Sequence, residues 1–249
     1  MSFTDDDIER YARHLVLSEI GGPGQQRLKA ARVAVVGLGG VGAPAALYLA
    51  AAGVGRLRLI DDDVVSLSNL QRQVLFATDD IGRGKVEVGA EALTALNPGV
   101  EIEAEAVRLT SANADALIAD CDVVLDGTDD FSTRFAVNAA CVAASRPLVS
   151  GALGRWSGQV GVFAGRPCYR CFVPEPPPDA ETCARVGVVG ALAGVVGSMA
   201  ALEAIKLITG AGRALTGRVV LYDGLTGEAR TAGIGADPAC TICAAGRSG

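Results

Sequence analysis

Short apolar runs alternate with segments of helical periodicity along most of the chain. The expected strands are 31–37, 57–61, 100–107 and 122–130, followed by PLVSGA and QVGVFA. The expected helices between them are 43–52, 81–96 and 131–145. Strands that alternate with helices of this length predict a mostly parallel sheet with helices on both faces. We therefore expect an α/β fold with a Rossmann-like, doubly wound sheet.

The two ends of the chain do not follow this alternation of strands and helices. Residues 1–30 predict a helical arm, in which an amphipathic helix is followed by a loop at GGPG. Residues 31–165 form the expected core, and 166–249 are expected to complete the sheet within the same domain. This last part contains an exposed, mobile loop at 173–190, where PEPPPD lies, then a small-residue helix at 191–209, a late strand at 218–224 and a cysteine-containing tail.

The segment after the first strand predicts a nucleotide site. Its sequence GLGGVG fits the pattern GxGxxG through Gly37, Gly39, Gly40 and Gly42. Such glycines permit a tight turn and bring backbone N–H groups close to phosphate at a helix N-terminus. Asp61 follows the second strand and is placed to accept hydrogen bonds from ribose hydroxyls. An NAD-dependent oxidoreductase would use the same pattern, and glycines can also serve helix–sheet packing alone.

Cationic side chains in the next loops favour ATP over a dinucleotide. Arg72 lies in SNLQRQ, and Lys85 ends the segment IGRGK. A triphosphate carries about four charges and favours Arg and Lys, whereas backbone N–H groups suffice for a pyrophosphate. This is no Walker P-loop, because Val86 stands where Ser or Thr is required.

The loop DGTDD after another strand predicts a magnesium site. A carboxylate beside a triphosphate would repel it unless it held a divalent cation. We assign that role to Asp129, whereas Asp130 can equally cap the helix at 131–145.

Four of the seven cysteines form two C-x2-C pairs. They are Cys168, Cys171, Cys240 and Cys243. Four thiolates presented in this way predict a closed, structural zinc site that pins the tail to the body. An iron–sulfur cluster or a redox pair would be the alternatives.

Two other groups of cysteines are expected to behave differently. Cys183 lies near Arg185 in the predicted mobile loop, where its thiol could ionise and attack an acyl adenylate or carry sulfur. Cys121 and Cys141 lie in apolar stretches and are expected to be small buried hydrophobes.

The composition restricts the partners and the compartment. Hydrophobic residues make up 50% of the chain, charged residues 20%, and the net charge is −6. An acidic protein lacks the general basic surface that holds a nucleic acid, so we expect no nucleic-acid partner. No signal peptide is expected at the start, and glycines and charges are expected to break the apolar stretches before they reach membrane-spanning length. We therefore expect a cytoplasmic protein with reduced thiols.

Several motifs together resemble the bacterial ThiF, MoeB and HesA adenylyltransferases, which are related to ubiquitin-activating enzymes. The resemblance covers almost the whole chain and rests on RYARHLVLSEIGGPGQQRL, the glycine loop, DDDVVSLSNLQRQVLF, DGTDD, SGALGRWSGQ, CYRC, the stretch ETCARVGVVGALAGVVGSMAALEAIKL and the closing cysteine pair. It implies ATP-dependent adenylylation of the C-terminal glycine carboxylate of a ubiquitin-like sulfur carrier. The product would serve sulfur transfer in thiamine, molybdopterin or related biosynthesis.

The resemblance also implies individual roles. Asp61 would hold ribose, Asn69, Arg72 and Lys85 would contact phosphates, and Asp129 would engage magnesium. Arg13 would reach the triphosphate from the partner subunit of a homodimer. In ThiF-like proteins the cysteine matching Cys183 can join covalently to the carrier, whereas in MoeB-like relatives it is dispensable.

Two departures from the family pattern affect this assignment. His14 replaces the usual Gln after Arg13, and DGTDD replaces DCTDN, which adds the negative charge of Asp130 beside the magnesium position.

Three other readings make different predictions. An NAD-dependent oxidoreductase would not need the cations Arg72 and Lys85. An ATP-dependent dehydratase that acts on tRNA is disfavoured by the acidic net charge. A non-catalytic scaffold would not need the residues of the nucleotide site. No rhodanese-like segment follows Cys243, so the sulfur donor is expected to be a separate protein.

Overall fold

The structure is a computed structural model that describes residues 3–177 and 187–244. An eight-stranded sheet organises it, with the strand order β3-β2-β1-β4-β5-β6-β7-β8. The strands are β1 (Arg32–Val36), β2 (Arg56–Ile60), β3 (Glu101–Glu105), β4 (Val123–Asp126), β5 (Leu148–Leu153), β6 (Ser157–Phe163), β7 (Arg218–Asp223) and β8 (Glu228–Gly233). Strands β1 to β5 pair in parallel, and β6 to β8 continue the sheet in antiparallel pairs. The expected mostly parallel, doubly wound α/β fold is confirmed.

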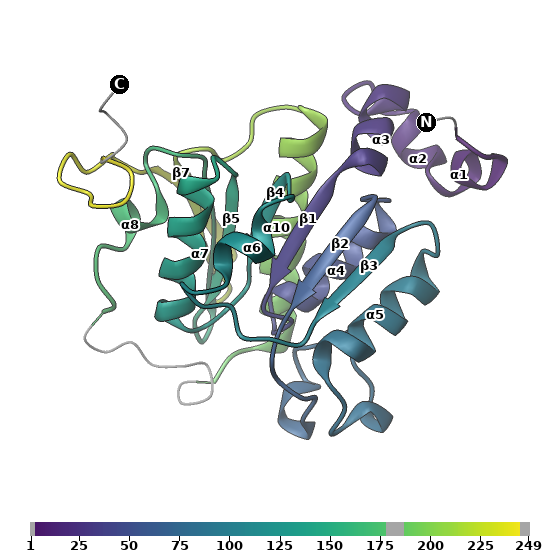
Figure 1. The fold of residues 1–249 in the computed structure, drawn as a ribbon, viewed down its shortest axis with the longest axis horizontal. Helices are drawn as coiled ribbons and strands as arrows, with labels where there is room; N and C mark the ends of the chain where they lie inside the picture. The colour runs from purple at the N-terminus through teal and green to yellow at the C-terminus, as the bar shows by residue number, and fades with distance from the viewer. Residues whose placement is uncertain (1–2, 178–186, 245–249) are drawn as a thin grey trace.

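Helices cover both faces of the sheet (Figure 1). The helices of the core and the C-terminal part are α4 (Gly42–Ala51), α5 (Lys85–Leu96), α6 (Ala114–Ile118), α7 (Phe131–Ala143), α8 (Tyr169–Phe172) and α10 (Gly190–Thr209). One apolar cluster joins the sheet to α4, α5 and α10, and a second joins it to α6 and α7. Strand β1 contributes Val33 and Val35 to the first cluster and Ala34 and Val36 to the second. Burial on both faces explains why its sequence is continuously apolar.

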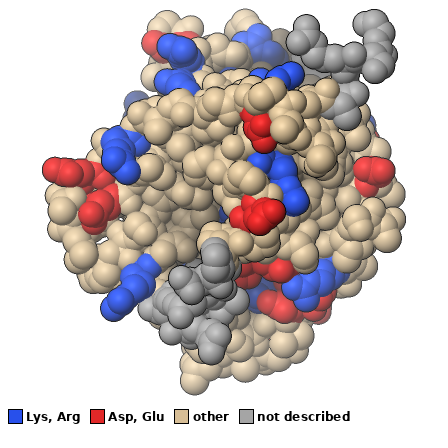
Figure 2. Space-filling model, turned by 90° about the vertical axis from the view of Figure 1, so that its left-hand side faces the viewer, with Lys and Arg blue, Asp and Glu red and all other residues tan. Residues whose placement is uncertain are grey.

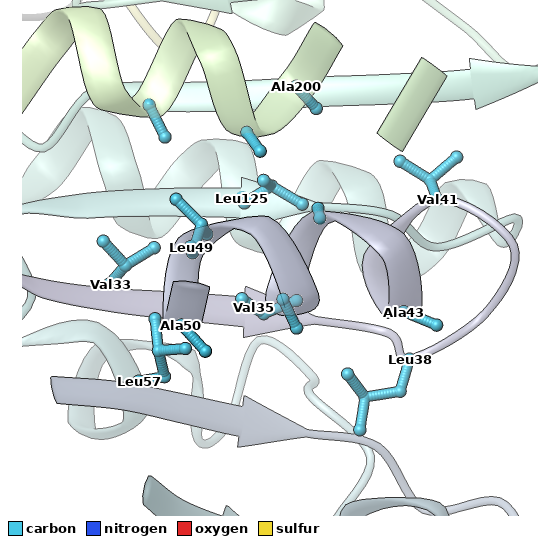
Figure 3. Close-up of a cluster of buried hydrophobic side chains, with 14 of the residues drawn as sticks. Val33, Val35, Leu38, Val41, Ala43, Leu49, Ala50, Leu57, Leu125 and Ala200 are labelled. Carbon is cyan, nitrogen blue, oxygen red and sulfur yellow. The ribbon is translucent and has the colours of Figure 1, made fainter. Parts of the chain in front are cut away.

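The packing of α4 fixes the position of the glycine loop that precedes it. Figure 3 shows Leu49 and Ala50 of α4 among side chains of three neighbouring strands, with Ala200 of α10 close by. Helices α4 and α10 meet at Gly197, where a Cβ atom would lie 2.4 Å from Cγ of Pro44. A glycine is therefore required for this close approach.

Helix α10 corrects one sequence expectation. It runs for 20 residues with a mean hydropathy of 1.7, so its length and composition would suffice to cross a membrane. Glycine and charge do not break it, because one face packs onto α4, β5 and β6 through residues such as Leu192, Val196 and Ala200. These contacts make it a core helix of a soluble fold.

The N-terminal arm contains α1 (Asp5–Arg10), α2 (Ala12–Leu15) and α3 (Gly21–Ala30). The expectation of a loop at GGPG was wrong, because these residues begin α3. Pro23 occupies the third position of the helix, within the first turn, where backbone N–H groups have no partner inside the helix. Proline therefore interrupts no hydrogen bond of α3.

Candidate functional site

A cavity of about 500 Å³ opens at the carboxyl ends of the parallel strands. It lies where the strand order reverses between β1 and β4, and its walls include the loops after β1, β2 and β4. Ligands of open α/β sheets collect at this switch point. The cavity volume lies in the range of small-molecule sites.

The glycine loop lies against the loop after β4. Gly37 has φ of +82° and its N–H donates to the carbonyl of Ile60. A Cβ atom at Gly42 would lie 1.8 Å from the carbonyl oxygen of Gly37, and one at Gly127 would lie 2.7 Å from the Gly42 nitrogen. Gly127, which departs from the family pattern, therefore allows a closer approach of the two loops than cysteine would. No side chain caps α4, but Ala43 N–H donates to Gly39 O and Pro44 has no N–H, so an anion at this end would have to use N–H groups of the glycine loop itself.

Asp61 lies at the end of β2 on the cavity wall. Its carboxylate accepts hydrogen bonds from the backbone N–H groups of Leu38, at 2.6 Å, and Asp63, at 2.8 Å. Burial raises the pKa of Asp61, and the charge of Lys85 and the two backbone N–H groups oppose this rise. The Asp61 carboxylate therefore stabilises the glycine loop through Leu38, and the same carboxylate also lines the cavity.

Three polar side chains from the segment after β2 also line the cavity. The carbonyl of Asn69 accepts from the backbone N–H of Arg72, and the Arg72 guanidinium donates to Ser68 O at 2.9 Å. Lys85 begins α5, is only 5% exposed, and its Nζ donates to Asp63 at 2.8 Å. The fold therefore brings Asn69, Arg72 and Lys85 to the same cavity as the glycine loop.

The three carboxylates of the loop after β4 have different surroundings. Asp126 is fully buried and accepts from the backbone N–H and hydroxyl of Thr128. Asp130 caps α7 by accepting from the backbone N–H groups of Ser132 and Thr133. Asp129 is exposed at the cavity and makes no hydrogen bond or ion pair with any other described residue. Asp129 is thus the carboxylate of this loop that remains available to a cation.

The capping contacts of Asp130 predict a pH-dependent contribution to stability. Burial would raise the pKa of Asp130, but hydrogen bonds from Thr133 and Ser132 outweigh it and hold the pKa at about 2. A lowered pKa stabilises the fold above the unfolded value of 3.8, and the gain disappears as the pH falls toward 2. Since the side chain is 36% exposed, we discount for solvent and expect Asp130→Ala to cost about 1 kcal/mol at pH 7. Urea titrations of both proteins from pH 7 to pH 3 should show this difference shrink in acid; a constant difference would contradict the assignment.

Sequence reasoning missed two buried polar residues of the cavity wall. Gln73 is 4% exposed, and its Oε1 has no hydrogen-bond partner among the described residues. Arg134 is 5% exposed and donates to the carbonyl oxygens of Thr128 and Gly151. Burial tends to lower the pKa of Arg134, whereas the charge of Asp126 raises it, so the buried guanidinium stays charged. Arg134 could have been recognised from the sequence, because it is a charged residue on the apolar face of the helix expected at 131–145.

Arg13 lies outside this cavity within one chain. It is exposed on α2, whereas its neighbour His14 pairs through Nδ1 with Gln25 Oε1 at 2.9 Å. Gln25 is fully buried and donates in turn to the carbonyl of Ala52. His14 thus anchors α2 to the body, and Arg13 points to solvent.

The four cysteines of the C-x2-C pairs converge at one place. Their Sγ atoms all lie within 4.8 Å of one another, with 3.7 Å between Cys168 and Cys240 and 3.4 Å between Cys171 and Cys243. Tetrahedral zinc with sulfur ligands has S–S edges of about 3.8 Å, so the donor set fits zinc. Within the group, backbone N–H groups of Cys243 and Ile242 outweigh burial and lower the pKa of Cys240 to about 7, whereas burial raises the pKa of Cys168 and of Cys243. We call these four residues the cysteine quartet.

The remaining cysteines differ in what can be said of them. Cys121 and Cys141 are each 2% exposed in the second apolar cluster, to which α7 contributes Cys141, as expected. Burial raises the pKa of Cys121 to about 11, which makes it an inert thiol at neutral pH. Cys183 lies outside the described residues.

Comparison with known proteins agrees with the fold. E. coli MccB in complex with AMPCPP and MccA has a TM-score of 0.84 at 24% identity, covering 98% of this chain and 75% of that chain. PaaA has a TM-score of 0.81 at 25% identity, covering 93% of this chain and 75% of that one.

Sequence relatives are closer and extend over nearly the whole chain. A sulfur carrier protein adenylyltransferase of Thermus thermophilus is 45% identical, covering 98% of this chain and 93% of the relative. The molybdopterin-synthase adenylyltransferase of Escherichia coli is 45% identical, covering 96% of this chain and 98% of the relative. The SAMP-activating enzyme E1 of Haloferax volcanii is 43% identical, covering 99% of this chain and 92% of the relative. The ThiF family model matches residues 11–242. The chain therefore belongs to the ThiF family.

Proposed function

We propose that this protein uses ATP to adenylylate the C-terminal glycine carboxylate of a ubiquitin-like sulfur-carrier protein. The observation that carries the proposal is the convergence of Arg72, Lys85 and Asp129 on one cavity beside the glycine loop. The chain covers more than 90% of the length of two relatives, a sulfur carrier protein adenylyltransferase and a molybdopterin-synthase adenylyltransferase. Their names support the same reaction. The product would enter thiamine, molybdopterin or related biosynthesis.

The proposed chemistry needs positioning more than proton transfer. The carrier carboxylate is ionised at pH 7 and attacks the α-phosphorus of ATP, so no general base is required. The bond to the β,γ-pyrophosphate breaks, and acyl-AMP and pyrophosphate result. Arg72, Lys85 and N–H groups of the glycine loop would neutralise phosphate charge, while Asn69 would contact phosphate and Asp61 would hold ribose. This agrees with a chain that contains one histidine.

Magnesium and zinc have separate proposed roles. Asp129 would hold magnesium, which supplies charge neutralisation to the triphosphate when bound. The cysteine quartet would hold structural zinc, because four sulfur ligands leave no open position for a substrate. The carboxylate of Asp130, which stands where the family pattern has Asn, accepts the capping hydrogen bonds of α7. We therefore expect its added charge to leave the magnesium position at Asp129 undisturbed.

The assembly is proposed as a homodimer in which Arg13 of each protomer reaches the nucleotide of the other. Arg13 is exposed and lies outside the cavity of its own chain. Apolar side chains on neighbouring helices are also exposed, among them Tyr48 of α4 at 57% and Leu202 of α10 at 55%. A second protomer would bury such residues.

The remaining proposals concern the chain's surroundings. We propose one adenylation domain, since residues on both sides of 165 contribute strands to one sheet. A cytoplasmic location and a separate sulfur donor stay part of the proposal. Figure 2 shows few charged side chains, of both signs, on a largely uncharged face, which suits a protein partner better than a nucleic acid.

Pyrophosphate exchange with candidate carriers tests the proposed reaction. A matching carrier should drive exchange of labelled pyrophosphate into ATP, and the same carrier without its final glycine should reduce exchange to background. The missing residue moves the carboxylate away from the α-phosphorus by about 3.5 Å, which removes in-line attack. Exchange that persists with the shortened carrier would contradict the proposal, and so would NADH-linked turnover in place of exchange.

The role of Cys183 is tested with the same carrier. We propose that its thiol attacks the acyl adenylate and forms a thioester, with AMP as the leaving group. Cys183→Ala should keep pyrophosphate exchange and abolish a carrier adduct that dithiothreitol cleaves. An undiminished adduct would exclude Cys183 as the nucleophile.

A further inference from the structure

Helix α7 carries a row of polar side chains on its buried side. Arg134 and Asn138 lie four residues apart on this face, and the partly exposed N-cap residue Asp130 precedes them at the same interval. Arg134 is 5% exposed and Asn138 is 1% exposed. Burying such groups costs free energy unless each is well paired, so their partners indicate what the row holds together.

Arg134 holds the loop that carries Asp129. Its Nη2 donates to the carbonyl of Thr128, which belongs to the peptide group shared with Asp129, and to Gly151 O of β5 at 2.9 Å. One rigid guanidinium thus ties the loop after β4 to the neighbouring strand. The charges of buried Asp126 and, more weakly, of Asp129 favour the charged form of Arg134 without occupying these two carbonyls.

The same row reaches the cysteine quartet. Asn138 Nδ2 lies 3.7 Å from Sγ of Cys168 and donates to it, and Asn138 Oδ1 accepts from the backbone N–H of Tyr169 at 2.8 Å. The Tyr169 hydroxyl lies 3.5 Å from Nη1 of Arg134. Tyr169 follows a ligand of the quartet directly and also lines the cavity. Through Tyr169, α7 joins the quartet to the loop of Asp129.

We propose that Arg134 is a positioning residue for the loop of Asp129, and that its contact with Tyr169 couples this loop to the metal held by the cysteine quartet. The inference rests on the proposed function, because it takes magnesium-bound ATP as the ligand of the cavity. Metal at the quartet fixes Cys168 and hence Tyr169, which restricts Arg134 to the position that holds the Thr128 carbonyl. Coupling between two sites is reciprocal, so ATP with magnesium must tighten the metal at the quartet by the same factor.

Zinc affinity measured with and without nucleotide tests the coupling. Zinc dissociation constants are obtained by competition with a chromophoric chelator, with saturating ATP and magnesium but no carrier, so that no turnover occurs. We expect the nucleotide to tighten zinc about tenfold in the native protein. In Tyr169→Phe the factor should fall below about twofold, whereas zinc affinity without nucleotide should change little, since the backbone bond to Asn138 remains. Tyr222→Phe, on β7 and outside both the cavity lining and the quartet, should keep the factor of about tenfold.

The outcomes separate this inference from the proposed function. If calorimetry shows that ATP binds but the nucleotide leaves the zinc dissociation constant of the native protein unchanged, the coupling alone is overturned. A factor that survives in Tyr169→Phe overturns the route through Tyr169. If ATP does not bind, the proposed function fails and the inference fails with it.

A second variant tests the positioning of the Asp129 loop. Arg134→Lys keeps the charge beside Asp126 but cannot hold the carbonyls of Thr128 and Gly151 together. We expect it to raise the magnesium concentration required for half-maximal ATP binding about tenfold, with one zinc per chain retained. An unchanged magnesium requirement in the folded variant would overturn the positioning role.

Discussion

Asp129→Asn is expected to reduce carrier-dependent pyrophosphate exchange about a thousandfold without unfolding the protein. Asp129 lies at the cavity with no hydrogen bond or ion pair to other described residues, so its carboxylate contributes little to the fold. The substitution keeps the shape of the side chain and removes the negative charge that holds magnesium. Exchange is measured by incorporation of labelled pyrophosphate into ATP, and folding by thermal unfolding.

Asp130→Asn is the matched control, because it removes the neighbouring charge in the same loop. Asparagine still caps a helix, so α7 should keep its N-terminus. We expect exchange within about threefold of the native rate. Equal losses in the two variants would mean that the loop needs its total charge, and the assignment of magnesium to Asp129 would be wrong.

Cys243→Ser is expected to give the largest loss of bound metal and of stability. The quartet draws Cys168 and Cys171 from the segment around α8 and Cys240 and Cys243 from the tail, so the metal links parts of the chain about seventy residues apart. Removing one thiolate should reduce zinc from about one equivalent per chain to about a tenth. We expect the melting temperature to fall by about 10 °C, as a loss of about 3 kcal/mol implies for a chain of this size.

Atomic emission and calorimetry check both parts of this expectation. Cys141→Ala is the control, because this buried cysteine lies on the core side of α7 and outside the quartet. It should lose stability through a small cavity but keep its zinc. Full metal content in Cys243→Ser, or iron in place of zinc in the native protein, would contradict the structural zinc site.

The fold was predictable where burial determines the sequence. Strands such as β1 and β4 are buried on both faces, so their residues form apolar runs that end at a loop. Strand β8 could not be found in this way, because every residue of EARTAG is exposed. Its backbone pairs with β7, and this pairing leaves no pattern of apolar side chains. The short helices α6 and α8 were missed for a similar reason, since four or five residues are too few to show a period.

The candidate site was predictable where residues follow strand ends. Asp61 comes directly after β2 and Asp129 lies in the loop after β4, so their convergence at one edge of the parallel strands follows from the topology. Arg134 and Gln73 were missed, because their burial depends on how α7 and the loop after β2 pack. Arg134 left a trace in the sequence, as it interrupts the apolar face of α7 four residues before Asn138.

Calorimetric titration of the double variant Arg72→Gln/Lys85→Met with ATP and magnesium tests the central claim most directly. Both cations line the cavity, and removing two charges from a triphosphate site should weaken ATP binding at least about a hundredfold. The native protein should bind ATP and give no heat with NADH. Unchanged ATP affinity in the double variant, or NADH bound in the native cavity, would contradict the account.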